Sequence, residues 1–284
     1  MPDNFHIYDS ESEFARNAKT IPQLLESAKF FRELSEHYRN MALSDELTGL
    51  PNRHATAAYI DGILSTVHQH GRHFGIADGF LIIACDIDKF KSINDTMGHD
   101  AGDAALTEFA RRLGGSVRSK ADPDNHQNRR QYDGYGIETD LVARHGGEEF
   151  LLILPMPRKD NMNIYEVSCR IQERVCGVYE LGEGRSWPMS MSMGIDFISW
   201  YELEKFISEF GNDSLTSKST QMHKFLFDGA DGASYEAKNT GRARSCLWHK
   251  TTRKTDTIYV YGGPVSGAVM ESRAQDAALG GLQS

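Results

Sequence analysis

The residues with the clearest capacity for chemistry stand at one turn, Gly146-Gly147-Glu148-Glu149. Two adjacent glycines between two strand-like runs predict a tight hairpin turn. Carboxylates beside such a turn can bind a hard cation, and backbone without side chains lets a phosphate approach closely. The alternative is an ordinary hairpin that carries two solvated acids. These four residues alone leave both interpretations open.

A second acidic group, Asp86-Ile87-Asp88, ends the apolar run 80–85, which predicts a fully buried strand. The end of such a strand is a common place for catalytic groups in α/β folds. If this strand neighbours the hairpin, Asp86 and Glu148 point into one crevice. For Asp88 we expect a structural role, as the cap of a helix that begins at Lys89.

Basic residues that could bind an anion come after each acidic group in the sequence. The amides of Lys89 and Phe90 open a predicted helix, where free N–H groups favour an anion. Lys91 adds positive charge nearby. Lys238 and Arg242 are spaced i, i+4, which places both on one side if their helix persists to that point. The ordinary role of a basic residue at a helix end is a solvated cap.

Six blocks of residues, in this order, resemble the GGDEF family of diguanylate cyclases, and together they cover about residues 44–249. The blocks are Asp45–Arg53, Asp86–Asp88 with Phe90-Lys91, Asn94-Asp95 through Gly102-Asp103, Gly146–Phe150, Ser192–Ile195, and Ala230-Asp231 through Gly241-Arg242.

The resemblance implies an enzyme that condenses two GTP molecules into cyclic di-GMP and releases two pyrophosphates. Because the product is two-fold symmetric, a homodimer of half-sites is the economical catalyst. Mg²⁺ is the implied metal, with Mn²⁺ as the alternative. Two other functions stay open: a catalytically silent module that binds GTP or cyclic di-GMP as a receptor, and a scaffold for a regulatory partner that the sequence does not identify.

The resemblance also implies a role for each acidic residue at the turn. Asp86, the carbonyl of Ile87 and Glu148 hold the metal, and oxygen ligands of this kind suit Mg²⁺. Glu149 either receives the 3′-hydroxyl proton or helps to hold a second metal, and these two roles stay open.

Two further residues are assigned to the guanine base. By resemblance Asp103 accepts the two donors on one guanine edge, and Asn94 adds amide contacts; adenine has no matching pair of donors. The alternative role for Asp103 is the N-cap of a helix beginning at Ala104, and both roles can coexist. The residues assigned to the phosphates are Lys89, Phe90, Lys91, Lys238 and Arg242.

One departure from the family pattern concerns feedback. Many members carry an inhibitory product site, Arg-x-x-Asp, six positions before the first glycine of the turn. Here Asp140 is present, but Ile137 occupies the arginine position and cannot donate forked hydrogen bonds. The string Arg130–Asp133 is out of register with the hairpin. We therefore expect no high-affinity product inhibition through this site.

The elements that must position these residues follow from hydrophobic periodicity. Helices are predicted over 55–70, 89–97, 101–113, 160–179 and 224–239, and strands over 80–87, 139–145, 148–154, 187–198 and 243–248. This alternation predicts an α/β (α+β) sandwich around a mixed sheet. The resemblance implies the palm-like nucleotidyl-cyclase fold, a mostly antiparallel mixed sheet flanked by helices.

The chain is expected to have three parts: residues 1–43, a catalytic domain over 44–250, and a tail over 251–284 that is partly disordered. Inserted loops are expected near 114–138 and 199–223, the second with a short extra helix as an alternative, and the tail contains one strand-like piece, Thr257–Tyr261. From Pro22 onward, apolar residues at a and d spacing predict a helix. It either packs on its own domain or forms a dimerising stalk, which the resemblance favours. These apolar residues are Leu24, Phe31, Leu34, Tyr38 and Met41.

Composition excludes several classes of protein. The 284 residues carry a net charge of −9, which argues against a general nucleic-acid binder. No apolar run reaches membrane-spanning length, and the polar N-terminus lacks the order of a signal peptide. We therefore expect a cytoplasmic protein without a membrane partner. The four cysteines are scattered, which predicts reduced thiols and no zinc site.

Overall fold

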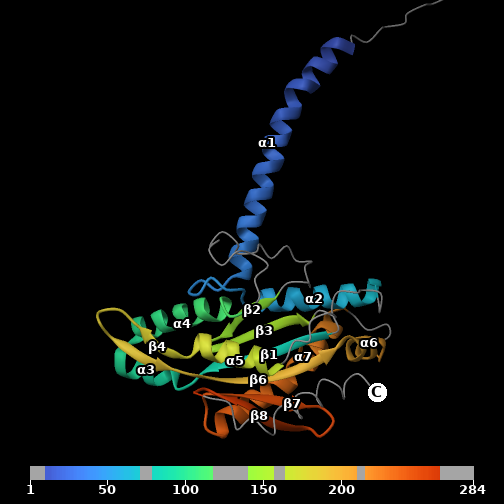
Figure 1. Ribbon diagram of the computed structural model, residues 1–284. Helices are drawn as coiled ribbons and strands as arrows, with labels where there is room; N and C mark the ends of the chain where they lie inside the picture. The colour runs from blue at the N-terminus through green and yellow to red at the C-terminus, as the bar shows by residue number, and fades with distance from the viewer. Residues whose placement is uncertain (1–9, 71–78, 118–139, 157–163, 210–214, 263–284) are drawn as a thin grey trace, which may run out of the picture. The chain divides into compact units, whose positions relative to one another are not determined.

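The computed structural model describes residues 10–70, 79–117, 140–156, 164–209 and 215–262 (Figure 1). The chain divides into two units, Met1–Ala42 and Leu43–Ser284. Helix α1 (Ser10–Leu43) accounts for the described part of the first unit, so this helix begins earlier than the predicted start at Pro22. Large apolar side chains along α1 are 59% to 65% exposed, namely Leu25, Phe30, Phe31, Tyr38 and Met41.

Within the described residues, the second unit is built on a six-stranded mixed sheet in the order β2-β3-β1-β6-β7-β8. All neighbouring strands are antiparallel except β6 and β7. The strands are β1 (Gly79–Ile87), β2 (Leu141–Gly146), β3 (Glu149–Met156), β6 (Met191–Ser199), β7 (Arg244–His249) and β8 (Lys254–Val260).

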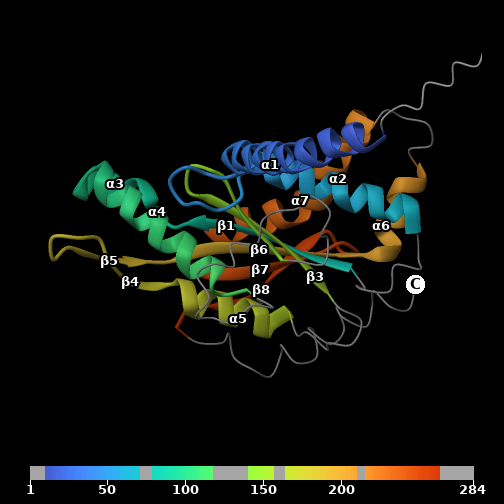
Figure 2. The ribbon, with the colours of Figure 1, turned by 90° about the horizontal axis from the view of Figure 1, so that it is seen from above.

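Helices cover both faces of this sheet (Figure 2). Side chains of the central strand alternate between two cores: Leu81 and Ile83 pack with α3, α4 and α5, while Phe80 and Ile82 pack with α2, α6 and α7. The predicted mixed α/β fold class is confirmed. The helices are α2 (Arg53–His70), α3 (Phe90–Met97), α4 (His99–Gly114), α5 (Ile164–Val175), α6 (Trp200–Glu209) and α7 (Leu215–Asn239).

Several predicted boundaries were wrong. The helix predicted over 160–179 ends at Val175, because Gly177 adopts a φ of 136° and the chain turns into β4 (Gly177–Glu180). The strand predicted over 187–198 is divided between β5 (Ser186–Met189), which pairs with β4, and β6.

The regions expected to be insertions and tail also contain regular structure. Helix α6 and the first turns of α7 occupy much of 199–223, and β8 begins at Lys254. Most of the expected loop 114–138 and the end of the tail lie outside the described residues. The four cysteines are free thiols, as predicted. Among the helices that the structure describes, none combines the length and apolar character needed to cross a bilayer.

Candidate active site

The hairpin and the end of the central strand meet at one end of the sheet. Strand β3 pairs with β1 so that Asp86 lies opposite Glu149. Gly147, with a φ of 48°, and Glu148 form the turn between β2 and β3, so Glu148 lies in the turn and Glu149 opens the strand. The amide of Ile87 donates a hydrogen bond to the carbonyl of Glu148 at 3.3 Å. The residues predicted to hold a metal are therefore neighbours.

The acidic side chains at this end of the sheet influence one another. Burial raises the pKa of Asp86, and the charges of Glu148 and Glu149 raise it further. Lys238 opposes these effects, because its Nζ forms an ion pair with Oδ2 of Asp86 at 2.7 Å. The pKa of Asp86 nevertheless stays above its ordinary value. The cluster of Asp86, Glu148 and Glu149 is thus a concentration of negative charge that a cation stabilises.

The predicted magnesium ligands fit this arrangement. In the described part of the chain, no group of three or more His, Cys, Asp and Glu side chains is arranged to hold a metal by itself. The predicted set requires only two such side chains, Asp86 and Glu148, with the carbonyl of Ile87. Such a partial set leaves positions for phosphate oxygens and water, as Mg²⁺ prefers. The mutual repulsion of the carboxylates supports the same assignment.

Asp88 does not cap a helix, so that prediction was wrong. Helix α3 has no side-chain cap, and Lys89 stands before it in the left-handed region with a φ of 56°. The buried Asp88 carboxylate instead accepts hydrogen bonds from Ser190 Oγ (2.6 Å), Ser192 Oγ (2.6 Å) and the amide of Ala243 (2.8 Å). Three donors satisfy the carboxylate more completely than one cap would, and they join the ends of β1, β6 and β7.

The residues assigned to phosphate at the start of α3 differ in their accessibility. Lys89 and Lys91 are exposed, whereas the side chain of Phe90 is buried in the core. The helix begins at Phe90, one position later than predicted. A ligand at this helix end can therefore use the Phe90 amide and the two lysines, but not the Phe90 ring.

The residues assigned to guanine lie at the contact between α3 and α4. Asn94 Oδ1 lies so close to Gly102 that a Cβ at that position would overlap with it. Glycine at 102 therefore lets the Asn94 amide pack against α4. Asp103, the next residue along this helix, is exposed. Because α4 begins at His99, Asp103 lies inside the helix, and the alternative prediction that it is an N-cap was wrong.

Lys238 and Arg242 do not share one helix face. Helix α7 ends at Asn239, and the amide of Arg242 closes the helix end by donating to the carbonyl of Ala237 at 2.9 Å. Gly241 and Arg242 have φ values of 129° and 62°, so the helix does not persist to Arg242 and the condition for the i, i+4 arrangement is not met. Arg242 remains at this end of the sheet, since the next residue donates its amide to Asp88.

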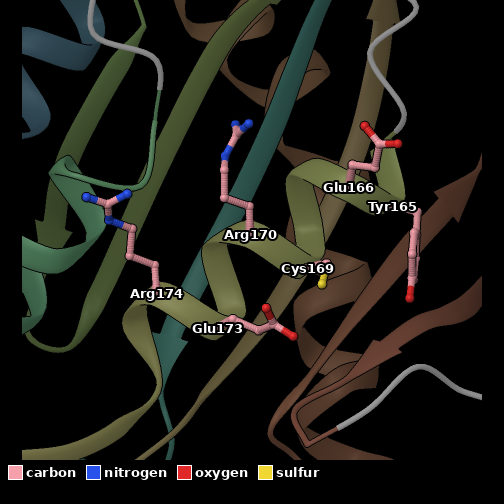
Figure 3. A pocket seen from close by; sticks show the side chains of 6 residues that line it. All are labelled: Tyr165, Glu166, Cys169, Arg170, Glu173 and Arg174. Atoms are coloured by element: carbon pink, nitrogen blue, oxygen red, sulfur yellow. The ribbon is translucent and has the colours of Figure 1, made fainter.

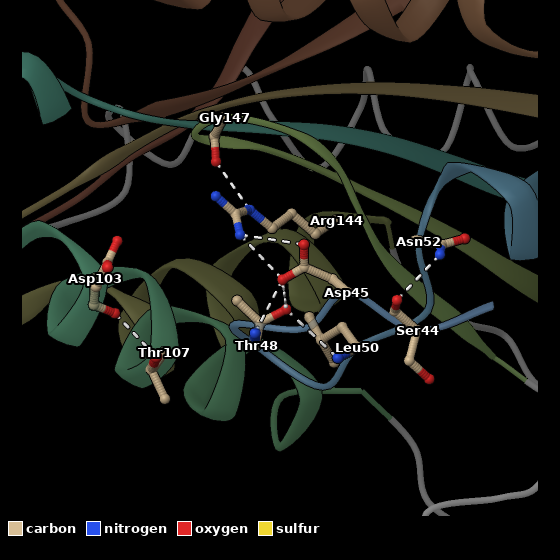
Figure 4. A network of polar contacts seen from close by, with 9 residues as sticks. All are labelled: Ser44, Asp45, Thr48, Leu50, Asn52, Asp103, Thr107, Arg144 and Gly147. Atoms are coloured by element: carbon tan, nitrogen blue, oxygen red, sulfur yellow. Dashed lines mark hydrogen bonds and ion pairs between the residues drawn. The ribbon is translucent and has the colours of Figure 1, made fainter. Parts of the chain in front are cut away.

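Sequence reasoning did not assign a role to Arg144 or Asp45, which position the turn (Figure 4). Arg144 Nε donates to the carbonyl of Gly147 at 2.9 Å, and its guanidinium binds Asp45 at 3.0 Å. Thr48 donates both its amide and its hydroxyl to Asp45. Burial raises the pKa of Asp45, but the bonds from Thr48 and the charge of Arg144 bring it below its usual value. The pattern Asp45-x-x-Thr48 was visible, whereas its contact with Arg144 was not.

Asp231 on α7 belongs to the same electrostatic cluster. Burial raises its pKa; His145 and Lys238 lower it, while Glu149 and Asp228 add to the rise. The motif Ala230-Asp231 was part of the resemblance, but the sequence alone suggested no role for the carboxylate. Asp140 stands immediately before β2, and Ile137 and the Arg130–Asp133 string lie outside the described residues.

A hollow on the surface of α5 contains none of the predicted site residues (Figure 3). Two of its side chains connect α5 to neighbouring segments: Arg170 donates to the carbonyl of Ser116, and Glu173 accepts from the hydroxyl of Tyr259. These two contacts hold α5 against the segment after α4 and against β8. The hollow is lined by Tyr165, Glu166, Cys169, Arg170, Glu173 and Arg174.

Comparison with known sequences identifies the family. Residues 42–123 match the family described as diguanylate cyclase, GGDEF domain. The chain is 30% identical over 233 residues to the response regulator PleD of Caulobacter vibrioides. This alignment covers 81% of this chain and 41% of PleD. It is 30% identical over 224 residues to the diguanylate cyclase DgcP of Pseudomonas aeruginosa, covering 79% and 26%. The chain belongs to the GGDEF family of diguanylate cyclases, and it spans less than half the length of these two relatives.

Solved structures share the fold. Diguanylate cyclase SiaD from Pseudomonas aeruginosa, in complex with its activator SiaC, matches with a TM-score of 0.55 at 23% identity, over 84% of this chain and 74% of that one. The coiled coil and GGDEF domain of DgcB from Caulobacter crescentus, in complex with c-di-GMP, matches with a TM-score of 0.53 at 23% identity, over 83% and 99%. At these identities the likeness establishes the fold alone.

Proposed function

We propose that this chain is an active diguanylate cyclase that condenses two GTP molecules into cyclic di-GMP and two pyrophosphates. One observation carries the proposal: Asp86, Glu148 and Glu149 converge at one end of the sheet, with Lys238 as their cationic neighbour. The charges of Glu148 and Glu149 repel that of Asp86, and a bound cation would relieve this repulsion.

The acidic residues would bind the metal and activate the nucleophile. Asp86, Glu148 and the carbonyl of Ile87 would hold Mg²⁺ or Mn²⁺, and the bound metal would polarise the α-phosphate and screen the triphosphate. Glu149 lies opposite Asp86 and is exposed, so its carboxylate can reach the 3′-hydroxyl of the substrate. It either accepts the proton of that hydroxyl or contributes to a second metal site.

The basic and polar residues would bind the nucleotide. The amides at the start of α3 contact phosphate oxygens, and charged side chains surround them. Asp103 and Asn94 would contact the guanine edge, since Asn94 packs against α4 at Gly102 and Asp103 follows Gly102 in that helix. The charged phosphate contacts are Lys89, Lys91, Lys238 and Arg242.

A homodimer would bring two such half-sites together. Each GTP presents its 3′-hydroxyl to the α-phosphate of the other, so both copies are needed for one product. The exposed apolar side chains of α1 provide a surface for a second copy of the same helix. Because SiaD was solved with an activator protein, a regulatory partner of this chain is a further part of the proposal.

The test is product formation by purified protein with GTP and Mg²⁺, measured by chromatography. We expect cyclic di-GMP from the wild type and a loss of about 100-fold or more in Asp86→Asn and Glu148→Gln, because each removes a charge that acts in the transition state. Glu180→Gln, at an exposed carboxylate on β4, is the matched control. Nucleotide binding without any product would favour the silent receptor instead.

A further inference from the structure

Lys238 forms an ion pair with one member of the acid cluster, Asp86. Its Nζ lies 2.7 Å from Oδ2 of Asp86, where their side chains are 33% and 14% exposed. The lysine belongs to the last turn of α7, and α7 packs directly on β6 at Gly194. The ammonium therefore stands beside the carboxylate to which the proposed function assigns the divalent cation.

This contact opposes metal binding by the proposed ligands. A metal ion on Asp86 and an ammonium at hydrogen-bond distance from the same carboxylate repel each other, and water screens this repulsion weakly because little of the Asp86 side chain is exposed. Lys238 is also one of the side chains assigned to the triphosphate. The Lys238 ammonium can bind a phosphate without competition only when Asp86 has another partner.

We propose that Lys238 is the internal counter-ion of Asp86, and that it competes with the divalent cation for this carboxylate. Binding of the nucleotide phosphates draws Lys238 away from Asp86 and vacates the carboxylate for the metal. The inference rests on the proposed function. It makes metal and nucleotide binding mutually reinforcing, since a coupling between two ligands is reciprocal.

The surrounding charges support this competition. Glu148, Glu149 and Asp231 all act electrostatically on the same region. Removing the ammonium would leave these acids with less positive charge nearby, so the domain alone should attract a divalent cation more strongly. The same removal would weaken the hold on the triphosphate.

The experiment is a titration of the full chain with Mn²⁺, in which electron paramagnetic resonance measures the free ion. Without nucleotide, we expect Lys238→Met to bind Mn²⁺ about threefold to tenfold more tightly than the wild type. Lys238→Arg keeps the positive charge and should stay close to the wild type. Lys224→Met removes an exposed lysine from the same helix and should also change nothing.

A second titration measures the coupling. The probe is a GTP analogue in which a methylene group replaces the oxygen between the α- and β-phosphorus atoms, which prevents condensation. The analogue should tighten Mn²⁺ binding more in the wild type than in Lys238→Met, because only the wild type has an ammonium to displace.

The outcomes separate this inference from the proposed function. Equal or weaker Mn²⁺ binding by Lys238→Met overturns the competition, even if the wild type makes cyclic di-GMP. A similar gain in Lys224→Met shows a general charge effect and also overturns it. Absence of Mn²⁺ binding in every protein, with and without the analogue, removes the metal site and therefore both proposals.

Discussion

Neighbouring acids at the end of β1 have different surroundings and therefore different tasks. Asp86 faces other carboxylates and one lysine, an arrangement suited to binding a ligand. Asp88, two positions later, is buried with three hydrogen-bond donors, an arrangement suited to holding strands together. Replacing Asp88 should thus disturb the fold, whereas replacing Asp86 should disturb chemistry.

A prediction at this scale concerns the guanine edge. Asp103→Asn replaces a pure acceptor with a group that also donates, so discrimination between GTP and ATP should fall by about 10- to 100-fold. Competition between the two nucleotides measures this ratio. Asp100→Asn, in the first turn of the same helix, is the control. Unchanged discrimination in Asp103→Asn would show that Asp103 does not read the base.

A second residue-scale prediction concerns pH. Burial raises the pKa of Asp196 from 3.8 to about 7; Lys250 lowers it in part, and Glu202 raises it. Between these two values the folded protein holds a proton that the unfolded chain has released. The stability contributed by this proton is therefore present at low pH and is lost as the pH rises through about 7.

Asp196→Asn cannot ionise, so it should flatten this part of the stability profile. At about pH 8 we expect its free energy of unfolding to exceed that of the wild type by about 2 to 4 kcal/mol. Urea unfolding between about pH 4 and 8 measures the difference, with the exposed Asp61→Asn as control. A slope identical to that of the wild type would contradict the assignment.

At the scale of elements, the contact between α7 and β6 holds Lys238 and Asp231 of α7 near the end of β1. A Cβ at Gly194 would overlap with the backbone of Ala230 and Ser234. The helix backbone therefore lies directly on the strand, which sets the distance from Lys238 to Asp86. Glycine at 194 is required for this close approach.

Gly194→Ala should force α7 away from the sheet. Because the obstructing atoms are backbone, we expect a loss of about 2 to 4 kcal/mol in stability and a lower activity in the surviving folded protein. Thermal unfolding and the product assay measure both effects. Gly232→Ala is the matched control, since its Cβ meets nothing and alanine favours a helix by about 1 kcal/mol. Equal destabilisation by both changes would refute the packing argument.

At the scale of the whole molecule, α1 is expected to bring two catalytic units together. Deleting residues 1–42 should lower the activity per monomer and make it depend steeply on concentration, because the half-sites must then meet by diffusion. Activity measured over a dilution series tests this. Fusion of a parallel dimeric coiled coil to the shortened chain should restore activity. Equal specific activity of the full and shortened chains at every dilution would exclude the stalk.

The sequence by itself determined the mixed α/β class, the hairpin at Gly146–Glu149 and the buried strand before Asp86. These features depend on hydrophobic periodicity and on turn residues. Both can be recognised within a short stretch of sequence. Boundaries were less accurate where one element runs into another, as at Gly177, because a hydrophobic pattern continues across the junction.

Only the tertiary structure decided which partners the polar side chains have. Local sequence predicts a helix cap for Asp88, yet its donors include an amide 155 positions away in the chain. Arg144 binds Asp45 across 99 positions, and Lys238 on helix α7 reaches Asp86 on strand β1. A carboxylate accepts from any donor that folding brings near. Its partners therefore depend on how strands and helices pack, and local sequence does not encode that packing.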